Sequence, residues 1–258
     1  NSCSFLTNYP NYFYNAALGR GSKKGEGITS LTVGQDGGKG ALANGGGGGN
    51  DHNSGGAGGS NYSRGGQGGD RSAGFLSCSG NENGIPGWGL STQGYSLLAP
   101  YAFMGGGGGA GHANDNEAPA GGRGGGMILI RANEVVSSGV EIRADGADAV
   151  TAGSDGGSGG GAGGSILLQV GSFTGTLDGL ARGGDGANTS IAQCQGPGGG
   201  GSGGVIWASS TLPVNVTTQI GGGSSGIATV ASCGGSSLNA ANGSPGVELN
   251  NLNLNQGG

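Results

Sequence analysis

Short apolar runs, each preceded by a glycine tract, recur along the second half of the chain. The clearest cover residues 127–130, 166–168 and 205–207. Short runs of β-branched residues and leucine that are bounded by glycine favour buried strands over helices. No segment combines capping residues with a 3.6-residue apolar period, so the sequence predicts almost no helix.

The apolar runs belong to a repeat. Met127, Ile166 and Val205 follow one another at equal intervals, and a second strand-like piece follows each run. A repeat unit that cannot bury its apolar face alone must stack on its neighbours. The sequence therefore predicts an all-β stack of short strands, solenoid-like or sandwich-like.

A weaker copy of the unit lies near the start of the chain. Residues 28–33 alternate between apolar and polar, and the glycine run 45–49 with His52 has an echo in 105–109 with His112. No linker separates one part from another, so we expect a single domain. Its predicted parts are an N-terminal arm (1–24), a first repeat (25–69), an irregular insertion (70–103), three 39-residue repeats (104–235) and a C-terminal tail (236–258).

Glycine dominates the composition. It supplies 71 of the 258 residues, and charged residues make up only 10%. This composition excludes an ordinary enzyme with a large aliphatic core, and collagen is excluded because glycine does not recur strictly at every third position. The glycine tracts could adopt one of two structures. They could be flexible loops, or they could be extended threefold helices that pack side by side. The regular period favours the second, so ordered tracts of the polyglycine-II type are expected.

Four cysteines and no CxxC pair indicate disulfides, and hence an exported protein. Cys194 and Cys233 lie one 39-residue repeat apart. Equivalent positions in stacked coils are about 4.8 Å apart, which suits a disulfide. The spacing predicts Cys194–Cys233, leaving Cys3 with Cys78, although four cysteines allow two other pairings. We interpret the start at Asn1, without Met or a leader, as a mature end left by removal of a signal peptide or pro-segment.

Few residues in the sequence suggest catalysis or metal binding. His52 and His112 both follow glycine runs, so we interpret them as loop residues, and the protein is expected not to be an enzyme. The segments 50–51 and 114–117 offer oxygen ligands that would suit calcium, but Asx turns explain most of them. No cofactor is therefore predicted, with calcium as the alternative. Turn formation is also expected for the aspartates that recur with the repeat, Asp36, Asp145 and Asp185.

Charge argues against nucleic acid as a partner. The net charge is -5, whereas phosphate binding needs a basic face. Three arginines precede Gly-Gly as in RGG elements, but in an acidic chain we expect them to lie on the surface; they are Arg64, Arg123 and Arg182. The abundant GxGxxG matches carry no weight at this glycine density, and no GK[ST] follows a glycine tract. Every apolar run is far too short to span a bilayer, so no transmembrane helix is predicted.

Aromatic residues are unevenly placed and supply the candidate binding residues. They are Tyr12, Phe13 and Tyr14 near the N-terminus, and Trp88, Tyr95 and Tyr101 in the insertion. Exposed aromatic clusters mark contacts with proteins or sugars. The alternative is that they form a small core that the aliphatic residues cannot supply. Trp207 lies in a repeat strand and is expected to be packed.

Two glycine-rich strings, at 45–53 and 61–69, resemble glycine-rich modules of secreted Bacteroidetes surface proteins. The segment 103–109 and the Gly-Gly-x-Ile-Leu-Leu units are similar to these modules as well. In that group the modules belong to large cell-surface adhesins exported by the type IX route. Over about residues 25–235 the resemblance implies an extracellular, non-enzymatic surface module, although 247–258 does not match a sorting domain. The glycine tracts alone are also similar to those of some bacteriophage tail-tip adhesins.

We therefore expect a rigid extracellular adhesion module that contacts a cell-surface protein or glycan through its arm and its insertion. One alternative is a subunit of an extracellular filament or sheath, in which open ends of the stack pair and 249–254 is offered as a strand. Another is ice binding, or phage-type receptor binding, by a flat glycine-rich face. An enzyme of the β-helix polysaccharide-lyase type is the least favoured, because no carboxylate cluster with a base is visible.

Overall fold

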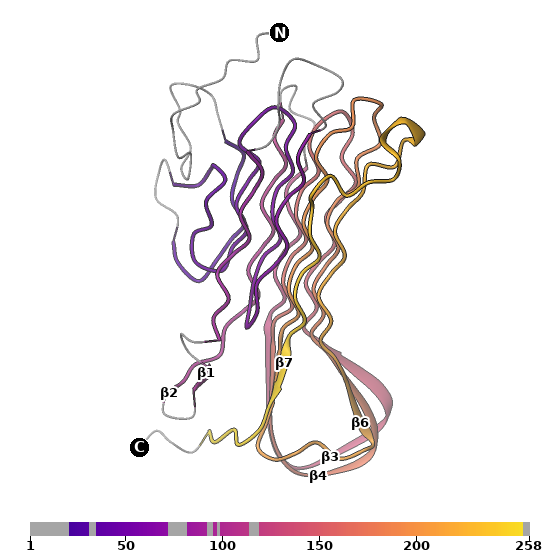
Figure 1. Ribbon diagram of the computed structural model, residues 1–258. Helices are drawn as coiled ribbons and strands as arrows, with labels where there is room; N and C mark the ends of the chain where they lie inside the picture. Colours follow the sequence, from indigo (N-terminus) through magenta and orange to yellow (C-terminus); the bar gives the residue numbers. More distant parts are fainter. Residues whose placement is uncertain are drawn as a thin grey trace.

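The computed structural model describes residues 21–30, 35–71, 82–91, 95–96, 99–113 and 119–254. Figure 1 shows two parts along one long axis, a body of undulating glycine-rich segments above and a ring of strands below. The predicted fold class is confirmed, because the described strands stack into a β-solenoid of about three turns. The one helical element in the described part is a three-residue 3-10 turn, η2 (Ala231–Cys233).

The solenoid strands all pair in parallel. They are β3 (Met127–Arg143), β4 (Ser165–Leu180), β5 (Val205–Ala208), β6 (Val216–Gln219) and β7 (Val247–Leu249). The order is β3-β4-β5-β7, and β6 pairs with the second half of β4. β3 and β4 each run down one leg of the ring and up the other, whereas the third turn is split into β5 and β6 (Figure 1). A separate antiparallel pair joins β1 (Tyr95–Ser96) to β2 (Ala99–Pro100).

The register of the turns differs from the predicted one. The equal spacing along the sequence would align Met127, Ile166 and Val205, but the structure pairs Ile128 with Ile166 and Ile166 with Ile206. A slip of one residue would turn every side chain to the opposite face of the strand. The observed register keeps the three isoleucines in one apolar cluster, so burial rather than constant spacing sets the alignment.

Apolar side chains lie on both sides of the ring wall. The interior holds a cluster around Ile166, Leu168 and Ile206, each at most 2% exposed. A second cluster on the outer side joins Leu167 and Trp207 to Tyr62, to Tyr95 of the insertion and to the C-terminal tail. The indole N–H of Trp207 donates to the carbonyl of Asn250 at 3.2 Å, so the prediction that this residue is packed is confirmed.

Ordered glycine helices make up the body, as predicted. In the tract 55–59, the amides of Gly56 and Gly59 donate to the carbonyls of Gly157 and Gly160, at 2.9 and 3.0 Å. Donors three residues apart thus reach the same neighbouring tract, which is the pattern of a helix with three residues per turn. The amides between them reach other tracts at similar distances. Each tract is therefore bonded to several neighbours, and the body is a bundle rather than a set of loops.

The first repeat contributes glycine helices but no strand in its described part. A strand was expected over 28–33; residues 28–30 are not in a strand, Ile28 is 48% exposed, and 31–34 lie outside the described residues. The predicted echo of 45–49 in 105–109 has a structural basis, because Gly46 donates to the carbonyl of Gly107 at 2.9 Å. The two tracts are neighbouring helices in the bundle.

Candidate functional site

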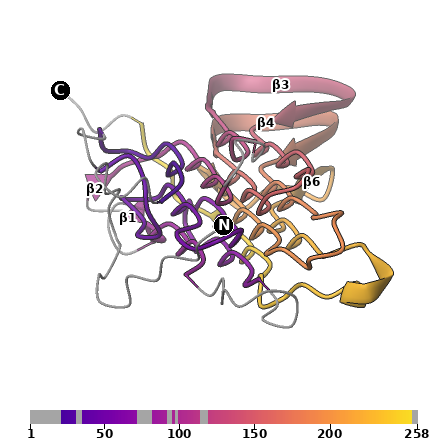
Figure 2. The ribbon, with the colours of Figure 1, turned by 90° about the horizontal axis from the view of Figure 1, so that it is seen from above.

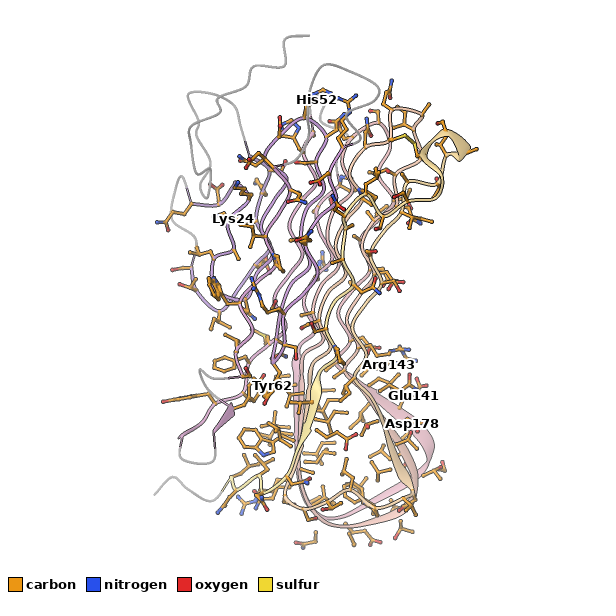
Figure 3. All side chains as sticks on the ribbon, in the orientation of Figure 1. Lys24, His52, Tyr62, Glu141, Arg143 and Asp178 are labelled. Atoms are coloured by element: carbon orange, nitrogen blue, oxygen red, sulfur yellow. A yellow bond between two sulfur atoms is a disulfide. The ribbon has the colours of Figure 1, made fainter. Side chains whose placement is uncertain are left out.

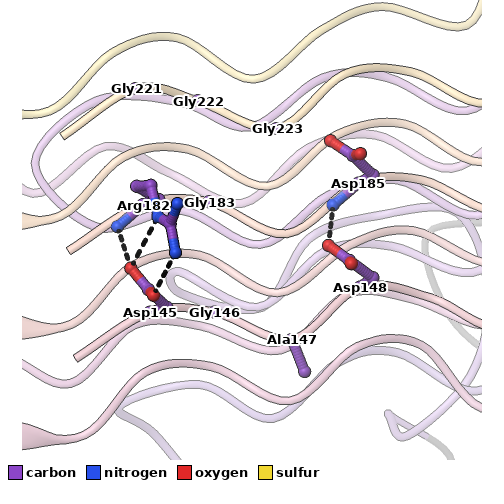
Figure 4. A pocket seen from close by; sticks show the side chains of 10 residues that line it. All are labelled: Asp145, Gly146, Ala147, Asp148, Arg182, Gly183, Asp185, Gly221, Gly222 and Gly223. Atoms are coloured by element: carbon purple, nitrogen blue, oxygen red, sulfur yellow. Dashed lines mark hydrogen bonds and ion pairs between the residues drawn. The ribbon is translucent and has the colours of Figure 1, made fainter. Parts of the chain in front are cut away.

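A shallow groove on the side of the body is lined by three consecutive turns (Figure 4). Its volume is about 520 Å³, and its charged side chains are Asp145, Asp148, Arg182 and Asp185. Asp145 accepts hydrogen bonds from the backbone N–H and the Nη2 of Arg182, both at 2.8 Å. Asp148 accepts from the backbone N–H of Asp185 at 2.7 Å.

The carboxylates of this groove bind the next turn of the stack. Asp185 continues the series by accepting from the backbone N–H of Ser224 at 2.6 Å. Burial raises the pKa of Asp145, but the hydrogen bonds and the charge of Arg182 outweigh burial and leave the pKa below its ordinary value. Asp145 and Asp185 were predicted to form turns; they instead join adjacent layers, and Arg182 lies on the surface as expected. The carboxylates of the groove therefore connect successive turns of the stack and have a structural role.

The two histidines meet at the top of the body, where Figure 3 labels His52. Their ring centroids are 6.5 Å apart, and His112 Nδ1 accepts the backbone N–H of Asn53 at 3.3 Å. Burial, followed by the charge of Arg71, lowers the pKa of His52. Among the described residues, no group of three or more His, Cys, Asp or Glu side chains gathers where a metal ion could bind. The calcium alternative at 114–117 lies outside these residues.

The candidate aromatic residues of the insertion divide into two kinds. Trp88 is 61% exposed and has the guanidinium of Arg64 5.3 Å above its ring, and Tyr101 is 59% exposed. Tyr95 instead packs against Phe103 and Trp207, with ring centroids at 5.4 and 6.2 Å. The core alternative therefore holds for Tyr95, and the surface alternative for the other two. Tyr12, Phe13 and Tyr14 lie outside the described residues.

The hydroxyl of Tyr95 supplies a pH-dependent contribution to stability. It contacts Asn61 Oδ1 and lies 3.0 Å from Ser165 Oγ, and burial raises the pKa of Tyr95 to about 12. In the unfolded chain the phenol ionises near pH 10. The folded form then holds the proton more tightly, so this contribution is present below pH 10 and is lost as the pH rises from about 10 to 12. Urea unfolding across this range should show the loss.

The variant Tyr95→Phe tests this prediction. It should be less stable than the parent at pH 7, because the polar groups of Asn61 and Ser165 lose a partner, by about 1–3 kcal/mol. Its stability should fall less steeply between pH 10 and 12. Tyr101→Phe is the matched control, because the ring of Tyr101 is exposed, and it should follow the parent at every pH. Parallel alkaline curves for Tyr95→Phe and the parent would contradict the assignment.

The predicted disulfide between Cys194 and Cys233 is confirmed. It joins adjacent turns with a Cα–Cα distance of 5.4 Å. Cys3 and Cys78 lie outside the described residues, so their pairing stays a prediction. Next to the disulfide, loop residues 236–239 and the pair Asp70–Arg71 line a pocket of about 400 Å³. Sequence reasoning missed this pocket, since no motif marks Arg71 and its partners lie in a distant part of the chain.

One end of the solenoid is open as far as the described residues go. β3 pairs with β4 on one edge, and within the described residues no strand pairs with its other edge. Seen from above in Figure 2, β3 is the outermost layer of the ring. Its exposed apolar side chains include Leu129 at 55%, Val136 at 73% and Val140 at 53%. At the opposite end, β7 covers β5 on one leg.

Comparison with known proteins finds no match among family models, curated proteins or solved structures. No helix in the described part of the chain is long and apolar enough to cross a membrane. The fold and its surfaces define a glycine-layered β-solenoid with an open edge strand at one end of its stack and a loop-built pocket on the body. The resemblance to Bacteroidetes surface modules stays a prediction.

Proposed function

We propose that the protein is a non-enzymatic extracellular module of the surface or adhesion type, and that it assembles in pairs through the open edge of β3. One observation carries the proposal, namely a 17-residue strand whose outer edge has no described partner. Natural sheets usually cover, shorten or charge such edges, because a long free edge recruits another strand. The disulfide suits an extracellular setting.

A second copy of the chain is the partner that fits this edge. The far end of the stack is stepped, because β7 adds a fourth layer on one leg while the other leg ends at β6 in the third. Head-to-tail stacking of a flat β3 turn on this step would leave one leg unpaired. Two β3 edges can instead meet antiparallel about a two-fold axis, which gives a closed pair. The geometry thus favours a dimer over the filament alternative.

The middle of β3 supports the antiparallel arrangement. With the two-fold axis at Val136, this residue faces its own copy, and its side chain is 73% exposed in the single chain. Facing aliphatic residues stabilise a strand pair. The charged residues near the end of β3 are engaged within the chain, because Glu141 contacts Arg143, and Figure 3 labels both on the second leg of the ring.

Sedimentation velocity at micromolar concentrations tests the dimer. We expect a parent dimer, and a monomer for Val136→Lys because two lysines would face each other across the axis. Val214→Lys is the matched control, because Val214 is fully exposed on the third turn. A parent that stays monomeric at 100-fold higher concentration, or a dimer unaffected by Val136→Lys, would overturn the proposal.

The adhesion role concerns a different part of the molecule. Aspartates of the side groove are engaged in bonds between layers, which supports a structural rather than a catalytic use of the body. Exposed Trp88 and Tyr101 offer aromatic surface for contact with a partner.

A further inference from the structure

Inside the stack, the glycine tracts use every backbone amide. Each residue of the tract 159–164, in the second turn, donates a hydrogen bond to a neighbouring segment. The direction of these bonds repeats at every third residue, as a helix with three residues per turn requires. One set reaches back to the second leg of the first turn, because the amides of Gly161 and Gly164 donate to the carbonyls of Ala147 and Ala144, at 3.0 and 2.7 Å. An inner tract thus depends on the turn that precedes it.

The corresponding tract of the first turn, 121–126, lies at the open end of the stack and is only partly bonded. By the register of β3 on β4, Gly126 corresponds to Gly164 and Arg123 corresponds to Gly161. Both residues of the first turn are exposed, and neither backbone amide has an acceptor in the part of the chain that the structure describes. Two amides, three residues apart, therefore face outward at this end where inner tracts are bonded to a preceding turn.

The second leg of the first turn carries the complementary groups. In the second turn, the carbonyls of Arg182 and Asp185 each accept an amide of the first turn, at 2.8 and 2.9 Å. The corresponding residues of the first turn are Asp145 and Asp148, on the adjacent segment in Figure 4. Among the residues that the structure describes, no amide donates to either of these two carbonyls. The open end thus presents two acceptors on one leg and two donors on the other, with the same spacing of three residues.

Gly126 is a glycine that the single chain does not need. At the corresponding positions of the later turns, Gly164, Gly204 and Gly246, an added Cβ would lie 1.8, 2.0 and 1.9 Å from a carbonyl oxygen of the turn before. At Gly126, no described atom lies within 4 Å of such a Cβ, and φ is not in the left-handed region. Neither crowding nor backbone conformation within the chain therefore requires glycine there. The close approach of a backbone from a second molecule would require it.

We propose that the glycine body takes part in the pair, with the tract 121–126 of one copy packed against the second leg of the other copy as a further glycine layer. The amides of Gly126 and Arg123 then donate to the carbonyls of Asp145 and Asp148, in the opposite chain directions that an antiparallel pair needs. The inference rests on the proposed pairing through β3, because the same two-fold axis places the first leg of each copy on the second leg of the other. It extends the contact from the ring into the body.

Sedimentation velocity of Gly126→Ala over a range of concentrations tests the contact. The added methyl group has room in the single chain, so dilute, monomeric protein should be as stable as the monomeric parent. In the pair the methyl group would meet the backbone of the other copy, so the dimer should dissociate about 10-fold more readily or more. Gly221→Ala is the matched control, because Gly221 is equally open but follows β6 in the third turn, and its dimer should be as tight as that of the parent.

Amide exchange followed by NMR then locates the contact. In the parent dimer, the amides of Arg123 and Gly126 should exchange about 10-fold more slowly, or slower still, than in the monomeric variant Val136→Lys. The amides of Gly122 and Gly125 donate to the second turn within the chain and should be protected in both proteins. A parent dimer with fast exchange at Arg123 and Gly126, or with an affinity that Gly126→Ala leaves unchanged, would overturn this inference and leave the pairing through β3 intact. A parent that stays monomeric would overturn both.

Discussion

A single methyl group added at Gly160 should destabilise the protein by about 3 kcal/mol or more, whereas the same methyl at Gly126 should be nearly neutral. A Cβ at Gly160 would lie 2.0 Å from the carbonyl oxygen of Gly184 and 2.8 Å from that of Asp185. Both obstacles are backbone atoms that neighbouring helices hold in place. The clash can therefore be relieved only by moving helices apart and stretching the bonds between them.

The matched pair isolates crowding from the general effect of replacing glycine. Gly126 has no atom within 4 Å of an added Cβ, and alanine there restricts the unfolded chain slightly. Urea unfolding of Gly160→Ala, Gly126→Ala and the parent gives the comparison. Amide exchange gives a second measurement, because the amides of tract 156–164 should be strongly protected in the parent and in Gly126→Ala. Equal stabilities of the two variants would mean that the tracts are not close-packed.

Alanine already occupies some tract positions, and their geometry supports the same reasoning. Ala57 and Ala162 are fully buried, so the bundle accepts a methyl where a helix face does not point at a neighbouring carbonyl. In the string Gly-Gly-Ala-Gly-Gly, the alanine thus marks a helix face that does not point at a neighbouring carbonyl, and the glycines mark the faces that do. This information could have been used to orient the helices before the structure was known.

Local patterning was enough to predict the elements of the ring. Glycine-bounded apolar runs became β3, β4 and β5, and the spacing of Cys194 and Cys233 identified the disulfide. The register could not be predicted in this way. An irregularity in the ladder between Ser138 and Val140, at a glycine with φ of 82°, changes the spacing within the first turn, and constant spacing cannot reveal it.

The candidate pocket was beyond local patterning for a different reason. Its walls meet because segments far apart in the chain become neighbours, as when the backbone N–H of Asp70 donates to the carbonyl of Leu238 at 2.6 Å. Such contacts join segments that are distant in the sequence, and no short motif encodes them. The burial of Arg71 and the missing hydrogen bonds of its Nε and Nη1 atoms likewise depend on the folded chain, because distant segments surround the side chain.

Removing the disulfide should have the second large effect. The bond joins two cysteines at a sequence separation of 39, and the chain-entropy relation for a loop of that length gives about 4 kcal/mol at 25 °C. Cys194 also has a positive φ of 50°, a conformation that is unfavourable for a residue with a side chain. The double variant Cys194→Ser, Cys233→Ser retains that unfavourable backbone without the cross-link that restricts the unfolded chain.

Unfolding in urea under non-reducing conditions measures the loss, with the parent as reference. The double variant should unfold at lower urea concentration with a larger m-value, because its unfolded state is more expanded. Ser232→Phe controls for disturbance of the same loop and should leave the stability unchanged, since Ser232 is exposed. A double variant as stable as the parent would show that hydrogen bonds between the layers alone hold the third turn, such as the bond from Thr229 to the carbonyl of Thr189 at 2.8 Å.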